Sequence, residues 1–403
     1  MAMRHLLVCA AIFSVLAQGI VLSTKGRWIV DPNGQRVKLR CVNWAGAGET
    51  HIPEGLASQP VDTITKLIAD GGFNCVRLTY SIDMALDPDE RVSTAFNRAA
   101  AETGQSSLTK IYDTGKGKNS FLASGTTRGA FEAVINSLNR KGILVILDNH
   151  TSKAQWCCGT SDGNGWWASA SGYNDANSRY FDTENWLSGL SAMAIWSKSF
   201  SNVVALSLRN ELRAVGGQDG NSHADWYKFV SRGAKAIHSA NPNALVVVGG
   251  VNYALDFSFM YSKPLDRASL GLSSKVLWEY HSYSFSTDVS NCANYQSYMG
   301  NNAGYLLAQG KPYTGPLWLS EFGFSQTSMS STEKSYWDCL RNYIEGNDAD
   351  WAYWAVQGNY YIREGEVDYD ETFGLLSHDW SVWRNPSWRT IFGDKIFRVN
   401  QTP

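Results

Sequence analysis

The segment Val203-Val-Ala-Leu-Ser-Leu208 is a short apolar run, and Arg209-Asn-Glu211 follows it directly. Seven other apolar runs of similar length recur along the chain, with amphipathic, helix-like stretches between them. Strands that alternate with helices in this way favour a parallel sheet, and eight such repeats predict a closed (β/α)8 barrel of the TIM type. The eight predicted strands cover residues 39–43, 75–78, 144–147, 203–208, 245–248, 276–278, 317–319 and 351–354.

The length of 403 residues suits one such barrel with insertions. The chain has no linker rich in Pro, Ser or Thr, so we expect a single domain over residues 21–403. The longest insertion follows the second predicted strand, from Tyr80 to about Gly125. It is polar and contains glycine, which indicates a long functional or mobile loop.

The first twenty residues have the pattern of a signal peptide. Arg4 and His5 precede an apolar stretch at 6–16, and the small residues Ala17 and Gly19 are spaced like a cleavage site. The apolar stretch is too short to span a bilayer. We therefore expect residues 1–20 to be removed and the protein to be secreted into the extracellular space.

The overall composition limits the possible partners. A net charge of −2 gives no basic surplus for nucleic acid or for an anionic membrane surface. The chain contains 16 Trp and 19 Tyr, an excess that suits stacking against the apolar faces of sugar rings as well as core packing. We expect a monomer that binds neither nucleic acid nor membranes.

Polar side chains stand where the apolar runs stop. In a (β/α)8 barrel the carboxyl ends of all strands meet at one rim, where active sites lie. Two of the strand ends carry glutamates, Glu211 after the fourth strand and Glu321 in the seventh. The other polar ends contain Arg77, Asp148-Asn-His150, Asn210, Tyr280-His281-Ser-Tyr283 and Trp354.

Two carboxylates across a barrel mouth can cleave a glycosidic bond. One must be protonated to give a proton to the leaving oxygen, and the other must be ionised to attack or stabilise the anomeric carbon. Arg77 beside Glu321 would keep that carboxylate ionised. Asn210 next to Glu211 can bond the sugar 2-hydroxyl.

The set resembles the active-site residues of glycoside hydrolase family 5, the cellulase family, over about residues 25–390. The matching positions, in the family's order, are Arg77, His150, Asn210, Glu211, His281, Tyr283, Glu321 and Trp354. The resemblance implies that Glu211 is the acid/base and Glu321 the nucleophile of a retaining enzyme, with its two carboxyl groups about 5–5.5 Å apart.

The same resemblance implies roles for the supporting residues. Arg77 and Tyr283 would orient Glu321, and His281 would exchange a proton with Glu211. His150 and Asn210 would hold the sugar nearest the cleaved bond, above a platform made by Trp354. Asp148 is interpreted as a structural partner rather than a catalytic group.

Several loop residues are further candidates for the sugar-binding surface. Asn43 and Trp44 end the first strand, and His51 follows them. Trp156, Trp166 and Trp167 surround Cys157-Cys158 and form either a sugar-stacking wall or a small core held by a disulfide. The remaining candidates are Tyr360 and Tyr361, which could border the cleft.

Six cysteines remain after the signal peptide, because Cys9 lies within it. No spacing resembles a zinc site, and we expect neither metal nor cofactor. If Asn43 and Arg77 point into the barrel, strand alternation places Cys41 and Cys75 there too. We expect these two to be buried free thiols, leaving Cys157, Cys158, Cys292 and Cys339 for disulfides.

The sequence therefore favours a secreted retaining hydrolase of β-glycosidic bonds in a polysaccharide or oligosaccharide, with an endo-β-glucanase as the first choice. A β-mannanase and an exo-acting β-glucosidase or β-1,3-glucanase are alternatives, the exo forms because the insertion could close one end of the cleft. A transglycosylase and a non-catalytic sugar-binding protein are further alternatives.

Overall fold

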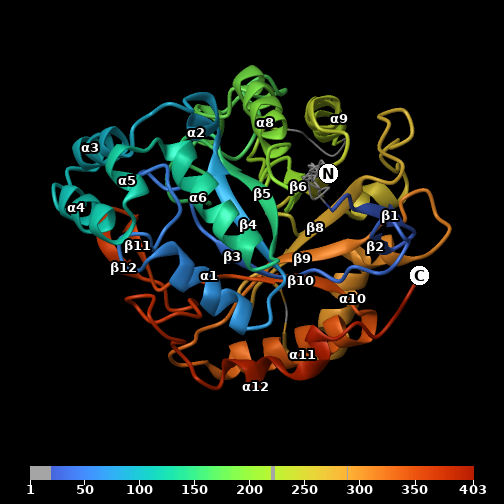
Figure 1. Ribbon diagram of the computed structural model, residues 1–403. Coiled ribbons are helices and arrows are strands. Elements are labelled where there is room, and N and C mark those ends of the chain that lie inside the picture. Colours follow the sequence, from blue (N-terminus) through green and yellow to red (C-terminus); the bar gives the residue numbers. More distant parts are fainter. Residues whose placement is uncertain (1–19, 219–222, 288) are drawn as a thin grey trace, which may run out of the picture.

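The computed structural model describes residues 20–218, 223–287 and 289–403. The predicted signal peptide lies, but for residue 20, outside the described residues. Eight parallel strands form a closed barrel in the order β10-β3-β4-β5-β6-β7-β8-β9, which confirms the predicted barrel (Figure 1). The barrel strands are β3 Arg40–Trp44, β4 Cys75–Ser81, β5 Leu144–Thr151, β6 Val203–Ser207, β7 Leu245–Gly249, β8 Val276–Ser282, β9 Leu317–Phe322 and β10 Asp350–Tyr353.

Helices surround the strands on the outside of the barrel (Figure 1). The longer helices are α1 Val61–Asp70, α6 Thr127–Arg140, α8 Thr183–Ser197, α9 Ala224–Ala240, α10 Cys292–Asn302 and α11 Ser331–Asn347. Side-chain caps fix where several of them begin. The hydroxyl of Thr126 caps α6, and Ser330 with Glu333 forms a capping box at α11.

Alternation along each strand separates two layers of side chains. In β4, Val76 and Leu78 pack outward against the helices, in the large cluster that joins strands to helices. Cys75 belongs to a second cluster, which fills the lower barrel interior. Arg77 and Thr79 are the next buried interior positions toward the carboxyl rim.

The prediction that Cys41 and Cys75 are free thiols is wrong. Both are fully buried in the barrel interior, as alternation predicted. However, β3 and β4 pair in a register that sets Cys41 directly opposite Cys75 with their Cα atoms 4.4 Å apart, and the two form a disulfide. Alternation gives the direction of a side chain but not its partner on the next strand. The described residues form two further disulfides, Cys157–Cys158 and Cys292–Cys339.

The segment between β4 and α6, predicted as a long loop, is largely helical. It contains α2 Ile82–Leu86, α3 Val92–Thr103, α4 Leu108–Lys118 and α5 Phe121–Ser124. Apolar residues at helical spacing, such as Val92, Phe96 and Ala99, are buried and give the segment its own packing. Helix α4 contacts the hairpin of β11 Asn359–Arg363 and β12 Glu366–Asp370 (Figure 1).

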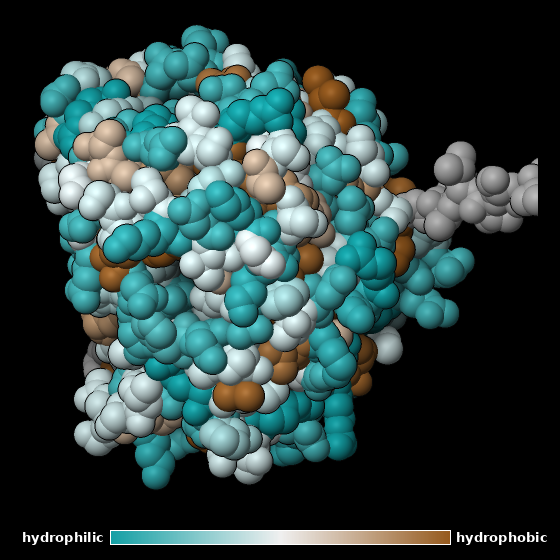
Figure 2. Space-filling view, turned by 60° about the vertical axis from the view of Figure 1, so that its left-hand side comes forward, coloured by the Kyte–Doolittle hydropathy of each residue, from teal (hydrophilic) through white to brown (hydrophobic). Residues whose placement is uncertain are grey.

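The remaining short elements are β1 Ser23–Lys25, β2 Trp28–Val30, α7 Asp175–Ser178, α12 Trp388–Phe392 and three 3-10 turns, η1 Ser258–Tyr261, η2 Gly304–Leu307 and η3 Asp394–Phe397. On the face seen in Figure 2, apolar residues are scattered among polar ones rather than gathered in one large patch. Among the described residues, no helix combines the length and hydropathy that crossing a membrane requires.

Candidate active site

A pocket of about 570 Å³ opens at the carboxyl ends of the barrel strands. It is lined by His150, Asn210, Glu211, His281, Tyr283, Glu321 and Trp354 from the predicted set. The strands of the barrel thus bring together residues that lie up to 204 positions apart in the sequence, from His150 to Trp354. Arg77 and Asn43 lie fully buried next to this set and do not line the pocket.

Arg77 is the central cation of the site. Its guanidinium donates to Glu321 Oε1 at 2.6 Å, to Asn43 Oδ1 at 3.0 Å and to Asn210 Oδ1 at 2.8 Å. It also lies 3.0 Å from a carboxylate oxygen of Asp148. Burial disfavours the charge, but the surrounding carboxylates outweigh it and raise the pKa of Arg77. The fork shape of the guanidinium lets one side chain position several partners at once.

Glu321 is held in place from two sides. Arg77 bonds one carboxylate oxygen, and the hydroxyl of Tyr283 donates to the other at 3.0 Å. Burial, with the nearby carboxylates, raises the pKa of Tyr283 well above its ordinary value, so the phenol keeps the proton that it donates. Both contacts hold the carboxylate of Glu321 in a fixed orientation toward the pocket.

Glu211 has a different environment. Its Oε1 lies 2.9 Å from Nδ1 of His281, and no arginine side chain among the described residues is bonded to its carboxylate. Burial raises the pKa of Glu211 above that of a free glutamate, against the opposing effect of Arg213. The residue has a left-handed backbone (φ 48°), and Arg213 bonds its carbonyl oxygen at 2.8 Å. Such a conformation is uncommon outside glycine and is frequent at functional sites.

The two glutamates face each other at short range. One oxygen of Glu211, one oxygen of Glu321 and a ring nitrogen of His281 all lie within 4.8 Å of one another. Burial lowers the pKa of His281 to about 4, so its ring is neutral at ordinary pH. A neutral ring can share a hydrogen bond with Glu211 Oε1 in either protonation state of that carboxyl.

His150, Asn210 and Trp354 line the pocket beside the carboxylates. His150 Nδ1 lies 2.7 Å from Asp148 Oδ2, which makes Asp148 the structural partner that the sequence indicated. The His150 ring stacks on Trp354 with centroids 5.6 Å apart and 16° between the planes. Asn210 accepts from Arg77 through Oδ1, which directs its amide nitrogen toward His150 and the pocket.

Two predicted surface residues lie elsewhere. Trp44 is fully buried, donates to the backbone of Glu54 and packs against Trp380. His51 is 4% exposed and pairs with Glu90 at 2.7 Å. Neither side chain lines the pocket.

The loop tryptophans, predicted to form either a wall of the cleft or a small core, lie in two different places. Trp166 and Trp167 are fully buried and belong to the helix-side core, whereas Trp156 lines the pocket. Tyr361 is buried too, with its hydroxyl bonded to the backbone near Pro53. Tyr360 is buried beside Glu371 and does not line the main pocket.

Sequence reasoning missed one whole wall of the pocket. Arg363, Tyr369, Glu371 and Phe373 line it from the β11–β12 hairpin and the residues that follow. Arg363 lies over the Trp156 ring at 3.7 Å and bonds Glu371 at 3.0 Å. The alternating residues on either side of Glu364-Gly365 were a hairpin signal that could have located this wall. Tyr253, Leu255, Phe285, Ser286 and Thr372, with Cys157 and Cys158, complete the lining.

In the part of the chain that the structure describes, two clusters have enough donor atoms to suggest a metal ion: His150 with Cys157 and Cys158, and Glu211 with His281 and Glu321. The two cysteines are bonded to each other, so they offer no thiolate. The second cluster consists of the two carboxylates and the neutral imidazole already described.

A barrel with two unlike carboxylates at its mouth, a carboxylate-holding arginine and aromatic walls defines the class of barrel glycosidases. The family model Cellulase (glycosyl hydrolase family 5) matches residues 30–360. The chain therefore belongs to glycosyl hydrolase family 5.

Individual relatives agree with this membership. A glycosyl hydrolase 5 family protein of Chamaecyparis obtusa is 37% identical, with 92% of this chain and 65% of that protein covered. The chain thus spans about two thirds of that relative. The major extracellular endoglucanase of Xanthomonas campestris pv. campestris is 26% identical, with 91% and 70% covered. The structure of the endocellulase from Pyrococcus horikoshii is similar in fold, with a TM-score of 0.72, 18% identity, and 94% and 99% covered.

Proposed function

We propose that this protein is a secreted retaining endo-β-glucanase, with Glu211 as acid/base and Glu321 as nucleophile. The observation that carries the proposal is the pair of glutamates with oxygens within 4.8 Å of each other and with opposite environments. Retaining glycosidases place their carboxyl groups about 5–5.5 Å apart, because the second carboxylate must reach the anomeric carbon directly.

In the first step, Glu211 donates its proton to the glycosidic oxygen while Glu321 attacks the anomeric carbon. The bond to the leaving sugar breaks, and an ester to Glu321 forms. In the second step, Glu211 removes a proton from water, and the resulting oxygen attacks the same carbon. The ester breaks, Glu321 leaves as a carboxylate, and the product keeps the β configuration.

The supporting residues favour both steps. Arg77 and Tyr283 orient Glu321 for attack, and the hydrogen bond between His281 and Glu211 positions the acid/base. Asn210 bonds the sugar 2-hydroxyl, a contact that strengthens as the ring approaches the transition state. His150 and Trp354 hold the same ring in position.

Endo-cleavage of a glucan is supported by two findings. None of residues 81–126, all of which the structure describes, lines the pocket, so this helical segment does not close the cleft. Relatives that match over most of this chain are named endoglucanases. A structure of the Pyrococcus horikoshii endocellulase was determined with cellotetraose, which makes β-1,4-linked glucose the first substrate to test.

Secretion and a single domain over residues 21–403 belong to the proposal. Disulfides between distant residues are typical of oxidising compartments, and the described part of the chain contains two, Cys41–Cys75 and Cys292–Cys339. One relative is named extracellular. The segment after β10 packs back on the barrel, with Phe397 against Trp351.

The test measures reducing ends and viscosity on carboxymethyl-cellulose, mannan, xylan, laminarin and a β-1,6-glucan. Wild type is compared with Glu321→Ala, Glu211→Gln and the control Glu184→Gln, whose side chain is 69% exposed. We expect a rapid fall in viscosity on carboxymethyl-cellulose, near-complete loss in the two site variants and no change in the control. Proton NMR should show a β product first. Cleavage of another polymer instead would change the proposed substrate. If Glu321→Ala and Glu211→Gln remained active, the catalytic assignment would be refuted.

A further inference from the structure

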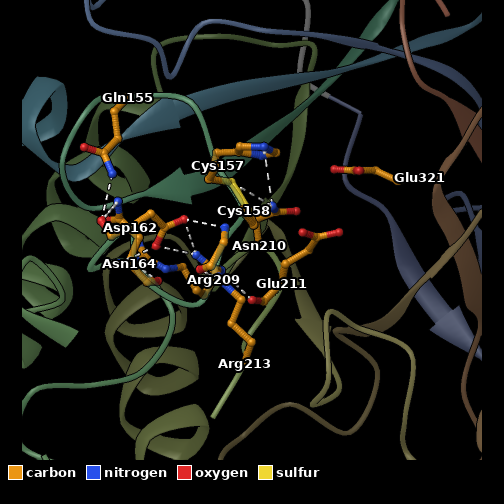
Figure 3. Close-up of a disulfide and its surroundings, with 12 residues drawn as sticks. Gln155, Cys157, Cys158, Asp162, Asn164, Arg209, Asn210, Glu211, Arg213 and Glu321 are labelled. Atoms are coloured by element: carbon orange, nitrogen blue, oxygen red, sulfur yellow. Dashed lines mark hydrogen bonds and ion pairs between the residues drawn. A yellow bond between two sulfur atoms is a disulfide. The ribbon is translucent and has the colours of Figure 1, made fainter. Parts of the chain in front are cut away.

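The disulfide between the neighbouring residues Cys157 and Cys158 lies in the wall of the active-site pocket. Both residues line the pocket together with Asn210 and Glu211, and Figure 3 shows the sulfur atoms next to Asn210, with Glu321 across from them. The proposed mechanism assigns no task to this disulfide.

The disulfide cannot serve stability in the usual way. A disulfide stabilises mainly by restricting the conformations of the unfolded chain, and the effect grows with the number of residues in the loop that it closes. Cys157 and Cys158 are one residue apart, against 34 for Cys41–Cys75 and 47 for Cys292–Cys339. Joining two neighbours ties no distant segments together.

Polar contacts already anchor the loop that carries the disulfide, residues 152–165. Arg213 bonds both carboxylate oxygens of Asp162 at 2.7 and 2.6 Å and the carbonyl of Gly159 at 2.7 Å. The side chain of Asn164 accepts from two backbone amides at the start of the loop. This network, drawn in Figure 3, positions the loop without the sulfur atoms.

The sulfur atoms instead face the amide that is proposed to bind sugar. The amide nitrogen of Asn210 lies 3.4 Å from Cys158 Sγ and 3.8 Å from Cys157 Sγ, while Arg77 occupies its carbonyl oxygen. The amide carries two protons, and His150 Nε2, 3.4 Å from the nitrogen, can accept one of them. Sulfur is a weak acceptor, so the other proton stays available for a stronger partner. A hydroxyl or a water in the same place would compete for that proton.

We propose that the Cys157–Cys158 disulfide is a substrate-contacting surface, an apolar wall for the sugar ring that Asn210 binds. Its polarisable atoms contact the C–H face of the ring and keep the Asn210 amide free for the 2-hydroxyl. The inference rests on the proposed function, since it needs a β-linked glucose unit in this pocket.

The test measures binding of cellotetraose, mannotetraose, xylotetraose and laminaritetraose by calorimetry in the Glu211→Gln background, which slows turnover. Into this background we introduce Cys157→Ala with Cys158→Ala, or Cys157→Ser with Cys158→Ser. The matched control is Cys292→Ala with Cys339→Ala, a disulfide outside the pocket. Melting temperatures are recorded for every variant.

We expect the alanine pair to raise the Kd of the bound tetrasaccharide at least about fivefold with almost no change in Tm. The serine pair should raise it further, because its hydroxyls compete for Asn210. The control should lower Tm and leave the Kd unchanged. An unchanged Kd in both the alanine and the serine replacements of Cys157 and Cys158 would overturn the inference. A fall in their Tm as large as that of the control would overturn it too. If the background protein binds none of the four sugars, the proposed substrate class and the inference fall together.

Discussion

Glu211 and Glu321 are the same amino acid in two different environments. Glu321 is bonded by Arg77 and Tyr283, while Glu211 is bonded only to the neutral His281 among the described side chains. In the proposed mechanism this difference would separate an acid from a nucleophile at one pH, as double displacement requires.

The raised pKa of Glu211 predicts an alkaline limb in the pH profile. Because Glu211 must be protonated, kcat/KM should fall as pH rises through its pKa. Glu211→Gln should lower activity on carboxymethyl-cellulose by about 10²–10⁴-fold. On an aryl β-cellobioside with a good leaving group the loss should be small and the alkaline limb should vanish. A limb that persists in Glu211→Gln would assign it to another residue.

Glu279 is a buried acid that the mechanism does not use. It lies in β8, 3.5 Å from Arg77, and burial together with the charges of Asp148 and Glu321 raises its pKa to about 8. Between about pH 4.3, where an unfolded glutamate titrates, and the folded value, the folded state holds a proton that the unfolded state lacks. The free energy of unfolding should therefore fall as pH rises through this window.

Glu279→Gln should remove this dependence. Between pH 5 and pH 8, the free energy of unfolding measured in urea should fall by about 2–4 kcal/mol more in wild type than in the variant. Glu184→Gln, at an exposed ion pair, should keep the wild-type slope. If the free energy of unfolding depended on pH in the same way in wild type and in Glu279→Gln, Glu279 would be ionised in the folded protein.

At the scale of elements, the β11–β12 hairpin determines one wall of the cleft. Arg363 covers Trp156 at 3.7 Å and thereby joins this hairpin to the loop after β5. Arg363→Ala should raise KM for cello-oligosaccharides about threefold to tenfold, with kcat little changed, since cation–π pairs contribute about 0.5–2 kcal/mol. Arg389→Ala, which removes a similar pair with Phe397 outside the pocket, should leave KM unchanged. Equal KM values for both variants would contradict this role.

Element positions were predictable because strand alternation and helical spacing are local patterns. All eight strands form, but β5, β8 and β9 continue to Thr151, Ser282 and Phe322, beyond the last apolar residue of each predicted run. Barrel strands keep pairing through polar positions, since backbone groups make the bonds. The two candidate glutamates could be located from the sequence because they stand at these rims. The hairpin wall was missed because its residues are brought to the pocket by a turn after the last strand.

Contacts between distant segments explain why two of the predicted residues lie away from the pocket. Trp44 stands at a strand end like a site residue, yet the backbone of Glu54 and the ring of Trp380 enclose it. His51 pairs with Glu90, which lies just before α3. Neither partner can be identified from the residues next to Trp44 or His51.

At the scale of the whole molecule, two disulfides join distant segments. Replacing Cys41 and Cys75 by alanine should lower the free energy of unfolding by about 4 kcal/mol, given the 34 residues between them. The Cys292 and Cys339 pair, with 47 residues between, should show a similar loss, and the Cys157 and Cys158 pair almost none. Guanidinium unfolding measures all three. Equal losses in the three double variants would show that loop entropy does not govern them.

The closure of the barrel by β10 has a consequence for how the chain folds. Trp351 pairs with Arg40 on β3, 311 residues earlier, and the same strand pairs with β9 on its other side. A chain that stops before Asp350 therefore leaves two parallel strand edges without partners, and exposed edges recruit strands from other chains. Incomplete synthesis or proteolysis on that side of β10 would turn a barrel into an aggregating species, so nearly the entire polypeptide must be made before the ring can close.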